Sequence, residues 1–132
     1  MAISRVTAAE THNVINEPLA IGFTPEMMDD AWNRIEPRIM EFQPQLIFLS
    51  AGFDAHVSDP AKGGTLTTES FSVLTHKIIN MSWQIESCRG RVISVLEGGY
   101  DVESDGALQQ SVKAHVEALL DARQPQADEQ DI

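Results

Sequence analysis

The most constraining feature of this sequence is a short apolar run that stops abruptly at small and polar residues. Residues 45–59 read QLIFLSAGFDAHVSD, and the apolar stretch at 46–49 ends at Ser50. Four to eight apolar residues bounded by turn formers are typical of a strand buried on both faces, as in a parallel sheet. Ligands of open α/β sheets bind just beyond the carboxyl ends of such strands. Asp54 and His56 follow the run directly, so we expect the chemistry of the chain in this loop.

The rest of the chain alternates between short apolar runs and longer helical patterns. Strands are expected at residues 14–20, 46–49 and 91–96. Apolar residues at helical spacing follow each strand, at residues 24–42, 68–85 and 104–122. A β-α-β-α-β-α order favours right-handed crossovers and a parallel sheet covered by helices. The predicted fold is therefore α/β, with a small parallel sheet of three strands flanked by helices.

Proline and threonine mark the expected boundaries. Thr24 suits a helix N-cap, because Pro25 follows it at the first helical position. Pro37 lies inside the same helical pattern, so we expect a kink or a break there. Pro18 removes one ladder hydrogen bond from residues 14–20, which makes this segment an edge strand or a strand end.

Composition limits the possible compartments and partners. The chain has 132 residues, one domain's worth, and a formal net charge of −11, which argues against a nucleic-acid partner. No apolar run approaches the roughly 18 residues of a membrane helix, and the start lacks the apolar region of a signal peptide. Cys88 is the only cysteine, so an internal disulfide is excluded and a cytoplasmic location is expected.

The acidic charge has two interpretations. An acidic body would attract cationic substrates such as polyamines or lysine-rich tails, whereas the simpler interpretation is a solvated surface that keeps the protein soluble. Part of the charge is local, because residues 121–132 read DARQPQADEQDI and are polar and acidic. We therefore expect residues 1–120 to form the folded part and residues 121–132 a frayed acidic tail.

Two residues stand out as candidates for catalysis. Asp54 and Tyr100 both follow a predicted strand, so they should lie at the same end of a parallel sheet. A carboxylate is an oxygen ligand that zinc accepts in catalytic sites. A phenol after Gly98-Gly99 is placed to donate a hydrogen bond to a developing oxyanion. The alternative is structural: an Asp after a strand often caps or turns the chain, and a Tyr there often packs.

The remaining polar candidates have plainer interpretations. His56 is either a second ligand, a partner behind the first ligand or a loop residue. Asp59 precedes a proline and should fix the turn. His76 and His115 fall on helical patterns, so we expect them at the surface or at an interface.

Two long stretches resemble the histone deacetylase family. They read PQLIFLSAGFDAHVSDPAKGGTLTTESF and GRVISVLEGGYDVES, and they are similar to the C-terminal third of class II members, which include bacterial deacetylase-like enzymes and acetylpolyamine amidohydrolases. The resemblance implies a three-layer arginase/deacetylase-like α/β fold and zinc-dependent hydrolysis of N-acetyl amides of lysine or a polyamine. It also implies that Asp54 is one of three Zn²⁺ ligands and that Tyr100 polarises the acetyl carbonyl.

The resemblance also implies that most of the site is missing from these residues. The family's other two zinc ligands, an Asp and a His, have no counterpart here, nor has its paired His-His general base and acid. In the family, the His that follows the ligand Asp is not itself a zinc ligand, so the resemblance implies that His56 does not bind zinc. We therefore expect a C-terminal deacetylase fragment that is inactive alone. The alternative is a non-catalytic α/β module that self-associates, and in both cases a homo-oligomer is expected.

Overall fold

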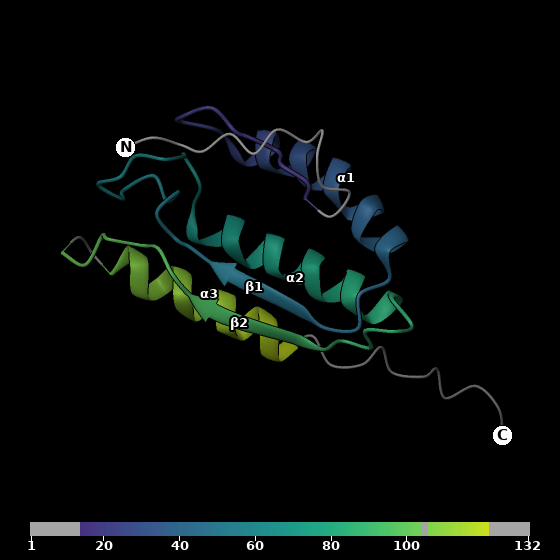
Figure 1. Ribbon diagram of the computed structural model, residues 1–132. Helices are drawn as coiled ribbons and strands as arrows, with labels where there is room; N and C mark the ends of the chain where they lie inside the picture. Colours follow the sequence, from purple (N-terminus) through teal and green to yellow (C-terminus); the bar gives the residue numbers. More distant parts are fainter. Residues whose placement is uncertain (1–13, 104–105, 122–132) are drawn as a thin grey trace, which may run out of the picture.

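The computed structural model describes residues 14–103 and 106–121. Along the chain the elements are α1 (Pro25–Phe42), β1 (Ile47–Ala51), α2 (Thr68–Gln84), β2 (Val92–Leu96) and α3 (Ala107–Asp121) (Figure 1). The two strands pair in parallel, with Ile47 opposite Val92 and Ala51 opposite Leu96. Their arrowheads point the same way in Figure 1, so the loops that follow β1 and β2 leave the sheet at the same end.

The first predicted strand, at residues 14–20, is absent, and the sheet of the described residues has two strands instead of three. That prediction was wrong because Pro18 lacks a ladder donor and the segment is held by a side chain instead. The carboxylate of Glu17 makes an ion pair with Arg34 of α1, at 2.8 Å. Of the tail predicted at residues 121–132, Asp121 is the last residue of α3 and residues 122–132 lie outside the described residues.

Helix α1 begins where the sequence predicts and continues where a break was expected. Thr24 is its N-cap, and its hydroxyl accepts the N–H of Met27 at 3.4 Å. The helix passes through Pro37 without interruption, so, of the expected kink or break, the break was wrong. Trp32, before the proline, and Ile39, after it, pack on the same core cluster, and this shared packing holds both halves in one helix.

Two apolar clusters form the core. The first contains Trp32 of α1 together with Ile78 and Met81 of α2, and Cys88 is fully buried beside them. The second lies at the carboxyl end of the strands, where the core residues are Met28, Phe53, Leu66 and Phe71. Because Phe53 immediately precedes Asp54, this second cluster fixes the start of the loop that carries the candidate site.

One face of the sheet is largely uncovered. Neighbouring strand residues point to opposite faces, and Ile47 and Leu49 point toward the helices and the core. The alternate residues are exposed: Phe48 to 68%, Ile93 to 45% and Val95 to 49%. These three side chains, here called the open sheet face, form an apolar surface that extends over both strands.

Helix α3 is attached through a buried histidine. His115 is buried, so, of the expected surface or interface position, the surface was wrong. Its Nδ1 lies 2.7 Å from the hydroxyl of Thr75, and its Nε2 lies 2.8 Å from that of Ser94. Since the Thr75 hydroxyl donates to the carbonyl of Phe71, it accepts from Nδ1–H, and in the neutral imidazole Nε2 accepts from Ser94. His115 thus links α2, α3 and β2, and burial lowers its pKa, which favours the neutral form.

Candidate functional site

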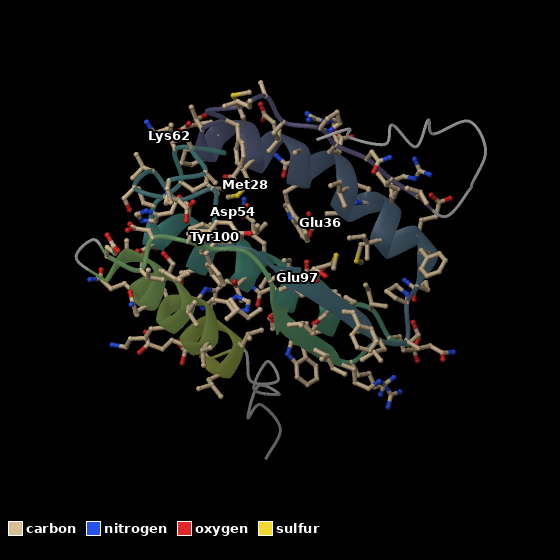
Figure 2. All side chains as sticks on the ribbon, turned by 60° about the vertical axis from the view of Figure 1, so that its left-hand side comes forward. Met28, Glu36, Asp54, Lys62, Glu97 and Tyr100 are labelled. Atoms are coloured by element: carbon tan, nitrogen blue, oxygen red, sulfur yellow. The ribbon has the colours of Figure 1, made fainter. Side chains whose placement is uncertain are left out.

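The two loops beyond β1 and β2 are joined by backbone hydrogen bonds. The N–H of Glu97 donates to the carbonyl of Ala51 at 3.0 Å, and the N–H of Phe53 donates to the carbonyl of Gly98 at 2.9 Å. These bonds extend the pairing of the strands past their ends. Asp54 and Tyr100 therefore lie at the same end of the sheet, as the sequence predicts, and Figure 2 shows them close together there.

Two glycines make room for this arrangement. A Cβ on Gly98 would lie 2.8 Å from the Oδ1 atom of Asp54, which is closer than such atoms approach in proteins. Gly99 has a φ of 128°, and a Cβ there would lie 2.5 Å from Leu108 of α3. The backbone conformation of Gly99 favours glycine, and a side chain at Gly98 would displace the Asp54 carboxylate, in keeping with the close approach expected after the second buried strand. The half-buried Asp54 carboxylate consequently rests against the backbone of the second loop.

Tyr100 is presented to solvent. Its side chain is 59% exposed, which argues against the alternative of a packing residue. Its backbone is held in place, because its N–H donates to the Oδ2 atom of Asp59 at 2.7 Å. An exposed phenol on a fixed backbone suits a group that contacts a substrate.

His56 takes part in a polar chain that joins the two loops from the side. The hydroxyl of Ser58 donates to the Oδ2 atom of Asp101 at 2.6 Å, and the Nδ1 atom of His56 lies 2.7 Å from the same hydroxyl oxygen. The imidazole stacks on the ring of Phe71, with centroids 6.3 Å apart and planes inclined by 14°.

His76, which like His115 falls on a helix, is half-buried on α2. Its Nδ1 lies 2.9 Å from the carbonyl oxygen of Ser72.

Asp59 has a wider role than its sequence position indicates. Its Oδ1 atom accepts the N–H of Ala61 at 2.8 Å, which confirms the predicted turn. Its Oδ2 atom also accepts the N–H groups of Tyr100 and Asp101, at 2.7 and 3.2 Å. No sequence signal announces this second role, because the partners are about forty positions away and contribute only backbone groups.

The described residues do not form a complete metal site. Within residues 14–103 and 106–121, no group of three or more His, Cys, Asp or Glu side chains could hold a metal ion. A catalytic zinc requires three protein ligands and an open position, whereas the resemblance assigns only Asp54 to such a role. The donor set of this part of the chain therefore does not fit zinc by itself.

No helix in the same residues is long and apolar enough to cross a membrane.

Comparison with known proteins identifies the family. Residues 2–119 match the family described as the histone deacetylase domain. The chain belongs to the histone deacetylase family. The Type-2 histone deacetylase 2 of Dictyostelium discoideum is 40% identical over 120 residues, which cover 90% of this chain and 7% of the relative. A probable deacetylase of Archaeoglobus fulgidus is 43% identical over 74 residues, covering 56% of this chain and 20% of the relative.

Solved structures confirm the fold of this deacetylase chain. The acetylpolyamine aminohydrolase from Burkholderia pseudomallei superposes with a TM-score of 0.67 at 26% identity, covering 80% of this chain and 28% of that protein. The arginase/deacetylase-like α/β fold expected from the sequence is therefore correct. The chain spans less than a third of the length of each of these relatives. Enzymes of the family are generally zinc-dependent.

Proposed function

We propose that this chain supplies the C-terminal part of a zinc-dependent deacetylase site that hydrolyses the N-acetyl amides of lysine or of a polyamine. One observation carries the proposal: the Asp54 carboxylate rests against Gly98, two residues before the exposed Tyr100. These are the residues that the resemblance assigns to metal binding and carbonyl polarisation. Family membership and the fold support the same class of reaction.

The two residues have separate roles in this proposal. Asp54 is one of the carboxylates that would hold Zn²⁺, and the rest of the ligand set comes from outside the described residues. Tyr100 donates its phenolic O–H to the carbonyl oxygen of the substrate amide as that oxygen gains negative charge. Its exposure leaves the hydroxyl accessible, and the fixed backbone limits the conformational freedom lost when a substrate binds.

The proposal includes inactivity of these 132 residues on their own. A site with one matched zinc ligand and without the His-His pair lacks both the metal and the general base of the family. Activity therefore requires the remainder of a deacetylase domain. A cytoplasmic location belongs to the same proposal and rests on the single, buried thiol of Cys88.

The experiment that tests this function restores the missing part. A chimera would carry this chain in place of the matched 120 residues of the Dictyostelium relative, with the unmodified relative as the positive control. Hydrolysis of an acetyl-lysine peptide or an acetylpolyamine that a chelator abolishes would support the proposal. A chimera that folds and binds zinc as the relative does, yet turns over neither substrate, would contradict it.

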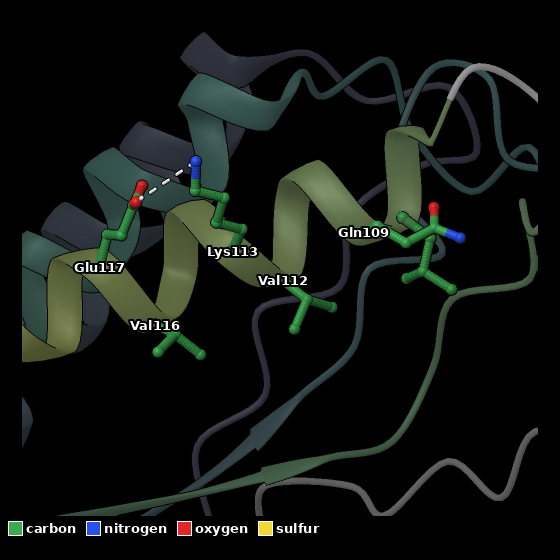
Figure 3. A pocket seen from close by; sticks show the side chains of 6 residues that line it. Gln109, Val112, Lys113, Val116 and Glu117 are labelled. Carbon is green, nitrogen blue, oxygen red and sulfur yellow. Dashed lines mark ion pairs between the residues drawn. The ribbon is translucent and has the colours of Figure 1, made fainter.

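A second candidate function is a non-catalytic module that self-associates. Two uncovered apolar surfaces favour it. The first is the open sheet face of Phe48, Ile93 and Val95. The second is a shallow groove along α3, shown in Figure 3 and lined by Leu108, Gln109, Val112, Lys113, Val116 and Glu117. The module would be favoured over the deacetylase if the 132-residue chain forms a stable oligomer and the chimera binds no zinc.

A further inference from the structure

We infer that Asp59 is a positioning residue for Tyr100, and that it fixes the backbone from which the phenol reaches the substrate. The inference rests on the proposed function for its catalytic meaning. Asp59 is a buried carboxylate that accepts backbone N–H groups from both loops.

The burial of Asp59 makes its three hydrogen bonds important. Its side chain is 2% exposed. Each of its oxygens accepts at least one backbone N–H, from Ala61 on its own loop and from Tyr100 and Asp101 on the other loop. No Lys, Arg or His in the part of the chain described here forms an ion pair with it. A buried acidic group of this kind is stabilised by its donors alone, so the donors and the carboxylate hold one another in place.

Asp59 holds the loop that carries Tyr100 directly after its two glycines. This loop leaves β2 through Gly98 and Gly99, which have no side chains to pack. The last backbone bond to the first loop before Tyr100 is the one accepted by the carbonyl of Gly98. Beyond it, Asp59 accepts the N–H groups of Tyr100 and Asp101, and Ser58 donates to the Asp101 carboxylate. Asp59 is thus the group that directly fixes the Tyr100 backbone.

Asp59→Ala is the sharpest test, because it removes both acceptor oxygens. The N–H groups of Ala61, Tyr100 and Asp101 then all lose their acceptor. Ser58→Ala is the matched control, because it removes the neighbouring cross-loop bond and leaves the Asp59 carboxylate intact.

Amide hydrogen exchange provides the first readout, measured on the 132-residue chain and on the chimera. In Asp59→Ala, exchange at Tyr100 and Asp101 should accelerate about 10- to 100-fold relative to exchange at Phe53 and Glu97, whose acceptors are backbone carbonyls. In Ser58→Ala, the Tyr100 amide should keep its protection. Equal acceleration at all four amides, or no acceleration at Tyr100 in either sample, would overturn the inference.

Kinetics of the chimera provide the second readout, which a purely structural role would not affect. Asp59→Ala should lower kcat about 10- to 100-fold at unchanged zinc content and nearly unchanged KM. In a Tyr100→Phe background the same substitution should have little further effect, because its route to the reaction has been removed. Additive losses would show that Asp59 does not act through Tyr100. An inactive wild-type chimera would count against the proposed function, while the exchange data would still decide the role of Asp59.

Discussion

The Oδ1 atom of Asp54 occupies the space where a side chain on Gly98 would begin, since a Cβ built on Gly98 would lie 2.8 Å from it. The residues are 44 positions apart and belong to the loops after β1 and β2. Their contact depends on the parallel pairing of the strands, which brings both carboxyl ends to one edge. The location of the Asp54 carboxylate is therefore set by the second loop as well as by its own.

The first prediction tests this contact. Gly98→Ala in the chimera should displace the Asp54 carboxylate and weaken zinc binding about 10-fold or more, which competition with a metal-binding dye would measure. Gly63→Ala is the control, because a Cβ there would lie 3.4 Å from the backbone oxygen of the same Asp54, at an ordinary contact distance. Equal zinc affinity in the two variants would show that the contact with Gly98 does not position the ligand.

Features of local origin could be predicted from the sequence. The apolar run before Ser50 and the Thr24-Pro25 pair indicate β1 and the start of α1, because short-range patterns and caps determine both. The common location of Asp54 and Tyr100 also follows from strand order. The contacts that could not be predicted from the sequence depend on partners that are far away along the chain. Examples are the bonds from Asp59 to the Tyr100 loop and the buried position of His115, whose partners are two hydroxyls on other elements.

The second prediction concerns the 132-residue chain alone. Incubated with a fluorogenic acetyl-lysine peptide and added zinc, it should give no turnover above buffer and bind no zinc tightly. The reason is that Asp54 is the single matched ligand, whereas a catalytic zinc requires three. Metal analysis after dialysis provides the second measurement. Hydrolysis that requires zinc and is lost with a chelator would contradict the fragment interpretation.

The third prediction concerns self-association through the open sheet face. Exposed apolar surfaces on two strands that pair only with each other among the described residues favour a partner, and a symmetric dimer is the commonest solution. Light scattering after size exclusion should give a mass above the 14.6 kDa of the monomer. Val95→Lys should shift the chain toward the monomer. Ile21→Lys is the control, because Ile21 is 91% exposed in a loop. A wild-type monomer at micromolar concentration would contradict the prediction.

The fourth prediction follows from the lowered pKa of His115. Below about pH 6.5 the unfolded chain binds a proton at this histidine that the folded chain does not bind. The free energy of unfolding should therefore fall as the pH decreases from about 7, by at most about 1.4 kcal/mol per pH unit, and this contribution should level off below the folded pKa. Urea unfolding at several pH values would measure it. His115→Gln should remove this part of the pH dependence, and identical slopes in both proteins would contradict the assignment.

The fifth prediction separates metal binding from carbonyl polarisation in the chimera. Asp54→Asn should abolish activity through loss of zinc, because a neutral amide oxygen is a poorer ligand than a carboxylate. Tyr100→Phe should keep the zinc and the fold but lower kcat about 10²- to 10³-fold, the usual effect of removing one oxyanion donor. Metal content and turnover, measured on the same samples, distinguish the two effects.

His56→Ala is the control for the ligand assignment. The imidazole of His56 stacks on Phe71 and lies against Ser58, so its removal should reduce the zinc content less than Asp54→Asn does. A chimera that loses zinc through His56→Ala but keeps it through Asp54→Asn would show that the metal binds the histidine. The carboxylate would then serve only the turn, and the role assigned to Asp54 by resemblance would be wrong.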